Sequence, residues 1–400
     1  MQTETEQSSV VDVREITACR LCESAHLWPF FLLGQQPLAN DLVPPGELDR
    51  IDFRAPLTVV RCDTCGHVQL LHTVSPTRLF SDYRFQSGIA SGWHQHCADF
   101  AAEQTERRGP GFVVDIGSND GTLLTKFQAL GWHVVGIEPA ANLARTALVQ
   151  TFHGSLTTAL AQWVRSSYRP ADLVVAQNVL GHVDDPIEFL RAARALLAPD
   201  GELVIEVPDL RRLLNTLAFD TIYHEHLSYW SDATLRRAAS RAGLRIVESA
   251  FLLVHGGSLR VTLRHEQRLR EPWTFADDDP LGTREPFHTF QARVEEHLQE
   301  LRNLWSIATP PIWGYGASAK ATVLLNALGL VPERIVDDTP GKQGFYIPGV
   351  RVPITAPVGL ETAQTLVLLS WNWADELKQR ARALGFGGEF LMPWPEPVLT

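Results

Sequence analysis

The chain has 400 residues, a length that predicts two or three domains, and 45% of them are hydrophobic, enough for buried cores. Its net charge of −11 with histidine neutral argues against a nucleic-acid substrate. No apolar run approaches the roughly 18 residues of a membrane span, and the polar residues 1–15 lack the pattern of a signal peptide. We therefore expect a cytoplasmic protein with a small-molecule substrate, no nucleic-acid or membrane partner, and a monomeric or weakly homo-oligomeric state.

Four cysteines form two C-x-x-C pairs, Cys19 with Cys22 and Cys62 with Cys65. Two such pairs can place four thiolates around one tetrahedral Zn²⁺, and a filled coordination sphere predicts a structural rather than a catalytic metal. The surrounding residues 14–75 are too few to form a large core, so we expect a zinc-binding domain that the metal helps to fold. Two unrelated redox or core pairs are the alternative.

An apolar strand runs into a glycine-rich turn at F-V-V-D-I-G-S-N-D-G, residues 112–121. Glycines in such a turn let the backbone approach a ligand closely. The next strand ends at Glu138, whose carboxylate can accept hydrogen bonds from ribose hydroxyls, although capping of the following helix is an alternative. The residues expected at a nucleotide-type cofactor are Asp115, Gly117, Asn119, Asp120, Gly121, Glu138 and Asn178.

Strands and helices alternate through the expected cofactor domain, residues 76–265, which predicts a mostly parallel sheet that binds ligands at the carboxyl ends of its strands. The last two strands follow each other without a helix, so we expect them to pair antiparallel. The predicted helices are 140–149, 187–197 and 232–242, and the later strands are 151–154, 172–178, 202–208, 244–252 and 258–264.

The turn after the first strand is G-S-N-D-G, with Asp115 before it, instead of the G-x-G-x-x-G typical of nicotinamide enzymes. It resembles the first motif of class I methyltransferases. The expected fold is therefore α/β: a class I methyltransferase Rossmann-like domain that binds S-adenosyl-L-methionine, flanked by the small zinc-binding domain and by a C-terminal Rossmann-like α/β domain.

The C-terminal domain is expected over residues 288–400. A helix with Phe290, Val294, Leu298, Leu301 and Trp305 on one face precedes P-I-W-G-Y-G-A-S-A-K-A, residues 311–321. This second pattern of strand, glycine turn and helix is a candidate anion site, because helix N-termini favour anions. A Rossmann-like half that only supports the fold is the alternative.

Five blocks occur in one order: the C-x-x-C pairs, D-I-G-S-N-D-G, Y-H-E-H, V-H-G-G and G-Y-G-A-S-A-K. Together they resemble the deoxysugar C-methyltransferase family, from Cys19 to about Trp394. The resemblance implies methylation, at C-3, of a nucleotide-linked 4-keto sugar in antibiotic biosynthesis, with a thymidine-diphosphate sugar as the expected substrate. The residues carried over are Tyr223, Glu225 and His226, with His226 as base, and His182 as a second active-site histidine. The C-terminal glycine turn would then bind the diphosphate, with Gly316, Ser318 and Lys320 near it.

Two positions depart from the family pattern. His224 stands where the family often has aspartate. In the segment 81–88, Tyr83 and Phe85 are the candidate ring residues, and the hydroxyl of the family's functional tyrosine is missing if that tyrosine aligns with Phe85. These departures motivate an alternative acceptor, a non-sugar carbon or oxygen. A nicotinamide oxidoreductase using the C-terminal glycine turn is a further alternative, and a metal knuckle at Y-H-E-H is disfavoured because His224 and His226 would point to opposite sides of an extended segment.

Overall fold

A seven-stranded sheet is the largest sheet in this computed structural model, which describes residues 12–80, 91–266 and 280–400. Its strand order is β12-β13-β10-β9-β6-β7-β8, and the five strands from β10 to β8 run parallel. The antiparallel pairing of β12 with β13 is confirmed. The strands are β6 Phe112–Ile116, β7 His133–Glu138, β8 Thr151–His153, β9 Ala171–Gln177, β10 Leu197–Pro208, β12 Leu244–Leu252 and β13 Ser258–His265.

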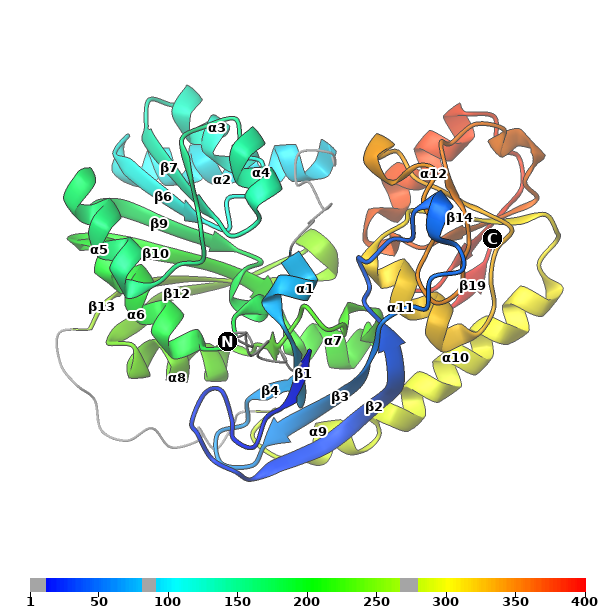
Figure 1. The fold of residues 1–400 in the computed structure, drawn as a ribbon, viewed down its shortest axis with the longest axis horizontal. Helices are drawn as coiled ribbons and strands as arrows, with labels where there is room; N and C mark the ends of the chain where they lie inside the picture. Colours follow the sequence, from blue (N-terminus) through cyan, green and yellow to red (C-terminus); the bar gives the residue numbers. More distant parts are fainter. Residues whose placement is uncertain (1–11, 81–90, 267–279) are drawn as a thin grey trace, which may run out of the picture.

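Helices cover both faces of this sheet (Figure 1). Their ends have local causes: Asp185 accepts a hydrogen bond from the Glu188 N–H at the start of α6, and Ser231 forms a capping box at the start of α8. The helices are α2 Ser91–Arg108, α3 Thr122–Ala129, α4 Ala141–Thr146, α5 Thr158–Ser167, α6 Pro186–Leu196, α7 Leu210–Thr216 and α8 Asp232–Arg241.

Two elements differ in length from the sequence prediction. The helix expected over 140–149 ends at Thr146, because the chain leaves the helix and the Leu148 N–H donates to the Asp120 carbonyl of the glycine turn. The strand expected from 202 begins at Leu197, and its pairing with β9 is irregular between Leu197 and Glu202.

A four-stranded antiparallel sheet carries the cysteine pairs, in the order β11-β4-β3-β2. Its edge strand β11, Ser228–Tyr229, comes from far along the chain, between α7 and α8. The predicted boundary at residue 76 does not anticipate this insertion. The other elements here are β1 Val13–Glu15, β2 Leu27–Pro37, β3 Arg54–Cys62, β4 Val68–Leu70, β5 His72–Val74 and α1 Pro76–Phe80.

A second α/β unit follows residue 280, with a six-stranded sheet ordered β16-β15-β14-β17-β18-β19 and parallel except for β19. The two α/β units lie side by side, with β2 and β3 below and between them (Figure 1). The elements are α9 Glu285–His288, α10 Phe290–Ile307, β14 Ile312–Tyr315, α11 Ala319–Leu328, β15 Ile335–Val336, β16 Ile354–Thr355, β17 Thr365–Leu368, α12 Ala374–Ala383, β18 Glu389–Met392 and β19 Val398–Leu399.

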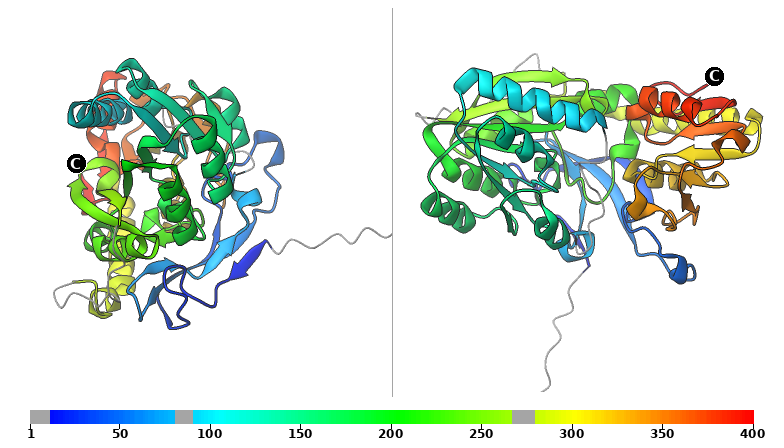
Figure 2. Two further views of the ribbon diagram at one scale, coloured as in Figure 1. Left: turned by 90° about the vertical axis from the view of Figure 1, so that its left-hand side faces the viewer. Right: turned by 90° about the horizontal axis from the view of Figure 1, so that it is seen from above.

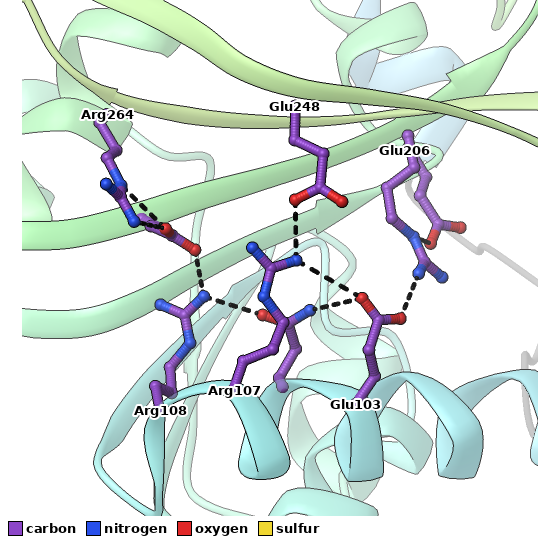
Figure 3. A network of polar contacts seen from close by, with 9 residues as sticks. Glu103, Arg107, Arg108, Glu206, Glu248 and Arg264 are labelled. Atoms are coloured by element: carbon purple, nitrogen blue, oxygen red, sulfur yellow. Dashed lines mark hydrogen bonds and ion pairs between the residues drawn. The ribbon is translucent and has the colours of Figure 1, made fainter.

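Charged pairs hold α2 against the strands β10, β12 and β13 (Figure 3). Arg107 lies 2.9 Å from Glu248, and Arg108 bonds to the buried Glu202. Arg260 bridges Glu103 at 2.9 Å and the buried Glu206 at 2.6 Å. Because the two buried acceptors, Glu202 and Glu206, are each multiply paired, this network fixes α2 over the sheet.

One hydrophobic cluster joins the three parts of the molecule. It includes Phe31 and Val59 from the cysteine-bearing sheet, Phe219 from the turn after α7, and Phe290 and Leu325 from the C-terminal unit. Viewed from above, the α/β units occupy opposite ends of the long axis (Figure 2). Within the described ranges, no helix combines the length and apolarity needed to cross a bilayer.

Candidate functional site

The four paired cysteines come together as predicted. Their sulfur atoms all lie within 4.8 Å of one another, with Cys19 Sγ 3.6 Å from Cys65 Sγ and Cys22 Sγ 3.5 Å from Cys62 Sγ. Zn–S bonds of about 2.3 Å in a tetrahedron place sulfur atoms about 3.8 Å apart, so this set fits Zn²⁺. Three of the cysteines are buried, which fits a closed structural site.

The glycine turn after β6 has the backbone that close ligand approach requires. Gly117, Asn119 and Gly121 all have positive φ, and a Cβ at Gly117 would lie 2.5 Å from Val179 Cγ2. The Glu138 carboxylate accepts hydrogen bonds from the Asn119 and Ala140 N–H groups, both at 2.8 Å. Each carboxylate oxygen keeps a further lone pair for a ribose hydroxyl, so Glu138 can orient the loop and hold a ligand.

The other expected cofactor residues differ in their surroundings and contacts. Asp115 is buried, and burial raises its pKa well above the ordinary value, with the Glu138 carboxyl adding to the rise. Asn178 has a left-handed backbone and donates its N–H to the Glu206 carbonyl. Asp120 instead accepts from the Thr122 N–H and hydroxyl, which is a local capping role at the start of α3.

His226, His182 and Tyr223 gather in one ring cluster. The ring centroid of His226 lies 4.9 Å from that of His182 and 4.0 Å from that of Tyr223. The turn that carries His182 begins at Val179, the residue that packs against Gly117, so the cluster adjoins the glycine turn. Each of the three side chains is only half-buried and keeps some exposed surface.

A backbone carbonyl fixes the protonation pattern of His226. Its Nδ1 lies 2.7 Å from the Thr221 carbonyl oxygen, which can only accept, so Nδ1 carries the proton and Nε2 has the lone pair. Burial lowers the pKa of His226 well below 6.5, with His182 and Lys320 contributing. Burial likewise lowers the pKa of His182 to about 4. Both rings are therefore neutral near neutral pH, as a general base must be.

The two remaining residues of the Y-H-E-H block are buried and face the cysteine-bearing module. Asn40 donates to Glu225 Oε1 at 2.7 Å, and His224 Nε2 donates to the Ala55 carbonyl at 3.1 Å. His224, which stands where the family often has aspartate, thus forms a hydrogen bond to β3. These contacts tie the two residues that precede His226 to the module that holds the cysteines.

The C-terminal glycine turn binds a carboxylate of its own chain. The Ala317 N–H donates to Asp337 Oδ2 at 2.7 Å, and Ser318 caps α11 through the Ala321 N–H. Gly316 has a φ of +96°. Lys320, in the first turn of α11, directs its ammonium away toward Trp371, 4.3 Å from the ring centroid. A Cβ at Gly316 would meet the side chain of Ser370, the residue next to Trp371, and the placement of Gly316, Ser318 and Lys320 near a diphosphate stays a prediction.

Sequence reasoning missed Asn40, Asp220 and Trp371. The Trp371 Nε1–H donates to Asp220 Oδ2 at 2.7 Å, and Asp220 precedes Thr221, the partner of His226. The Trp371–Asp220 and Asn40–Glu225 contacts each join residues far apart in the chain, so no local motif marks them. Tyr83 and Phe85 lie outside the described residues.

Three family descriptions match the chain in series: a zinc binding domain over 19–80, a methyltransferase domain over 90–249 and a C-methyltransferase C-terminal domain over 253–395. The C-methyltransferase NovU of Streptomyces niveus is 34% identical over 96% of this chain and 97% of its own length. The chain belongs to the C-methyltransferase family. This C-methyltransferase depends on S-adenosylmethionine, has the class I Rossmann-like fold and contains a structural zinc site, as predicted.

More distant relatives share only part of the C-methyltransferase. The ubiquinone biosynthesis O-methyltransferase of Caulobacter sp. (strain K31) is 31% identical over 30% of this chain and 48% of its own length. The magnesium protoporphyrin IX methyltransferase of Synechocystis PCC 6803 with bound SAM has a TM-score of 0.34 and 17% identity over 47% of this chain and 88% of its own. The acceptor and the roles of single residues stay predictions.

Proposed function

We propose that this C-methyltransferase methylates C-3 of a nucleotide-linked 4-keto-deoxysugar, with His226 as the base. A carbon beside a ketone becomes nucleophilic only after it loses a proton. His226 Nε2 takes that proton, and the C–H electron pair becomes the double bond of an enolate. When bound, S-adenosylmethionine supplies a sulfonium methyl group, which the enolate carbon takes while the C–S electron pair stays on sulfur.

The observation that carries the proposal is the bond between His226 Nδ1 and the Thr221 carbonyl. It leaves the Nε2 lone pair as the proton acceptor on a half-buried ring beside His182 and Tyr223. Asp115, the glycine turn and Glu138 are the proposed cofactor residues. The rings of His182 and Tyr223 lie 4.9 and 4.0 Å from the His226 ring, and their proposed role is to position the ketone. Glu225 supports His226 through the backbone of their shared segment.

Mass spectrometry of products formed from labelled S-adenosylmethionine and a panel of thymidine-diphosphate keto sugars tests the acceptor. Methylation of none of these sugars would favour a non-sugar acceptor. A product methylated at C-3 supports the proposal.

The variant His226→Asn tests the base. We expect kcat to fall by roughly 10²- to 10⁴-fold, the range that a general base contributes, with unchanged affinity for S-adenosylhomocysteine. Exchange of the C-3 proton with deuterated solvent, measured with S-adenosylhomocysteine bound, should stop as well. His133→Asn, a substitution on an exposed β7 residue, is the matched control and should leave both rates unchanged. Exchange at the wild-type rate in His226→Asn would remove His226 from the mechanism.

A further inference from the structure

The ammonium group of Lys320 is buried without a conventional partner. Its nitrogen is inaccessible to solvent and has no hydrogen-bond acceptor among the residues that the structure describes. The centroid of the Trp371 ring lies 4.3 Å from this nitrogen. The ring attracts the cation but accepts no conventional hydrogen bond from its three N–H donors. A buried ammonium with three unused donors is costly, so this group is placed for an acceptor that comes from outside the chain.

A short series of contacts connects Lys320 to the proposed base. The Trp371 ring beneath the ammonium donates its Nε1–H to Asp220 Oδ2 at 2.7 Å, and the next residue, Thr221, holds His226 Nδ1 at 2.7 Å. The Lys320 charge acts at both ends of this series, because it lowers the pKa of His226 and opposes the burial that raises the pKa of Asp220 to about 6. Lys320 of the C-terminal unit is thus linked to His226 of the cofactor domain by direct contacts and by charge.

The C-terminal glycine turn does not offer the same ammonium to a diphosphate. Its Ala317 N–H already donates to the Asp337 carboxylate. Lys342 Nζ forms an ion pair with this carboxylate at 3.6 Å and donates to the Ala317 carbonyl at 2.9 Å. A diphosphate at this N–H would meet a carboxylate, which is unfavourable between like charges. Lys320 points instead toward Trp371 and Asp220, so its ligand is a different anionic oxygen.

We propose that Lys320 donates a hydrogen bond to the ketone oxygen of the acceptor and stabilises the oxyanion of the enolate. This inference rests on the proposed function. As His226 Nε2 takes the proton, the C–H electron pair forms the carbon–carbon double bond and the carbonyl π pair moves onto oxygen. The negative charge then lies on the oxygen that Lys320 contacts. Asp220 keeps the lysine cationic, and the Trp371 ring holds the ammonium in place without accepting its hydrogen bonds.

The variants Lys320→Met and Lys320→Arg separate this role from diphosphate binding. Met preserves the length of the side chain and removes its charge, so we expect kcat and C-3 deuterium exchange to fall together by about 10²- to 10³-fold, as when one oxyanion donor is lost. The affinity for thymidine diphosphate, measured by calorimetry, should stay within twofold of wild type, a margin of about 0.4 kcal/mol. Arg, with its charge retained, should recover part of the exchange rate.

The pH profile gives an independent readout. Among the described residues, the charged or titratable side chains that act on the His226 ring are His182 and Lys320. The Tyr223 ring lies 4.0 Å from it at a tilt of 35°, and Asp220 is next to its partner Thr221. Loss of the Lys320 cation removes repulsion of the imidazolium, so the acid limb of kcat/KM should move to higher pH in Lys320→Met. S-adenosylhomocysteine binding and the melting temperature report whether the variant is folded.

Three results would overturn the inference. If the wild type methylates keto sugars and Lys320→Met is equally active, Lys320 has no role in the reaction. The proposed function and the role of His226 would then be unaffected. A tenfold weaker affinity for thymidine diphosphate with normal exchange at saturating substrate would assign Lys320 to the diphosphate. Failure of the wild type to methylate any keto sugar would remove the acceptor on which both proposals rest.

Discussion

At the scale of single residues, the backbone decides which atom of His226 can act. The motif Y-H-E-H places a histidine at this position, but the sequence does not say which ring nitrogen is free. The Thr221 carbonyl, 2.7 Å from Nδ1, settles this point. The contact comes from the same loop, five residues earlier, so the segment that carries the proposed base also supplies the group that orients it.

Gly117 gives a residue-scale prediction about the cofactor loop. Its φ of +68° and the 2.5 Å approach of Val179 Cγ2 to a built Cβ leave no room for a side chain. Gly117→Ala should lower stability by roughly 1–3 kcal/mol and should weaken S-adenosylmethionine binding, because Val179 or the loop must move. Calorimetric titration and urea unfolding measure the two effects.

Gly109 is the matched control for that substitution. Its φ is +73°, but nothing lies within 4 Å of a Cβ built there. Gly109→Ala therefore introduces backbone strain without a clash and should lower stability while cofactor affinity stays normal. Equal losses of affinity in the two variants would mean that strain, and not the shape of the loop, controls binding.

At the scale of elements, strand β11 links the cysteine-bearing module to the segment that carries the proposed base. Ser228 and Tyr229 pair with Gln69 and Val68 of β4, which begins three residues after Cys65. His67 Nε2 lies 3.1 Å from Ser228 Oγ, and the Leu70 N–H donates to the Leu227 carbonyl at 2.9 Å. Only Leu227 separates β11 from His226, so the segment that holds zinc also positions the proposed base.

Zinc removal should therefore stop catalysis before it disrupts the cofactor domain. We expect chelation, or Cys62→Ser, to abolish methyl transfer and to speed hydrogen exchange of the β11 amides, while S-adenosylhomocysteine affinity stays within a few-fold of the holoprotein. Cys97→Ser is the control, since Cys97 is a buried cysteine on α2 outside the cluster. Full activity of the zinc-free protein would contradict this coupling.

A milder variant tests the same coupling without touching the metal. Asn40→Ala removes the 2.7 Å hydrogen bond to Glu225 and leaves the cysteines in place. It should lower kcat with normal zinc content and normal cofactor affinity. An unchanged kcat would limit the role of the module to β11.

The sequence predicts the elements that are encoded locally and fails where distant segments meet. The C-x-x-C pairs and the strand before Gly117 carry their signals within a few residues, and the structure brings the four cysteines together. Strand β11 has only two residues, too few for a periodic pattern, and it pairs across more than 150 positions of sequence. The direction of the Lys320 side chain depends on Asp220 and Trp371, which no motif links to it.

At the scale of the whole molecule, the core is shared between units that the sequence presents as separate domains. The ring of Phe31 on β2 packs edge-on against Phe290 of α10, with centroids 5.0 Å apart, and lies 6.3 Å from Phe219. Phe219 directly precedes Asp220, next to the site. The cysteine-bearing sheet is too small to bury much apolar surface by itself, and the shared core supplies part of that burial.

Phe290→Ala should therefore weaken the metal module from a distance. Loss of a fully buried phenylalanine costs about 3–5 kcal/mol, and here the cavity would open against Phe30 and Phe31. We expect lower stability in urea and faster loss of zinc to a chelator. Phe386→Ala is the control, because Phe386 is buried in a separate cluster within the C-terminal unit. It should lower stability but leave the rate of zinc loss unchanged; equal zinc loss in both variants would mean that the module responds to global unfolding and not to the shared core.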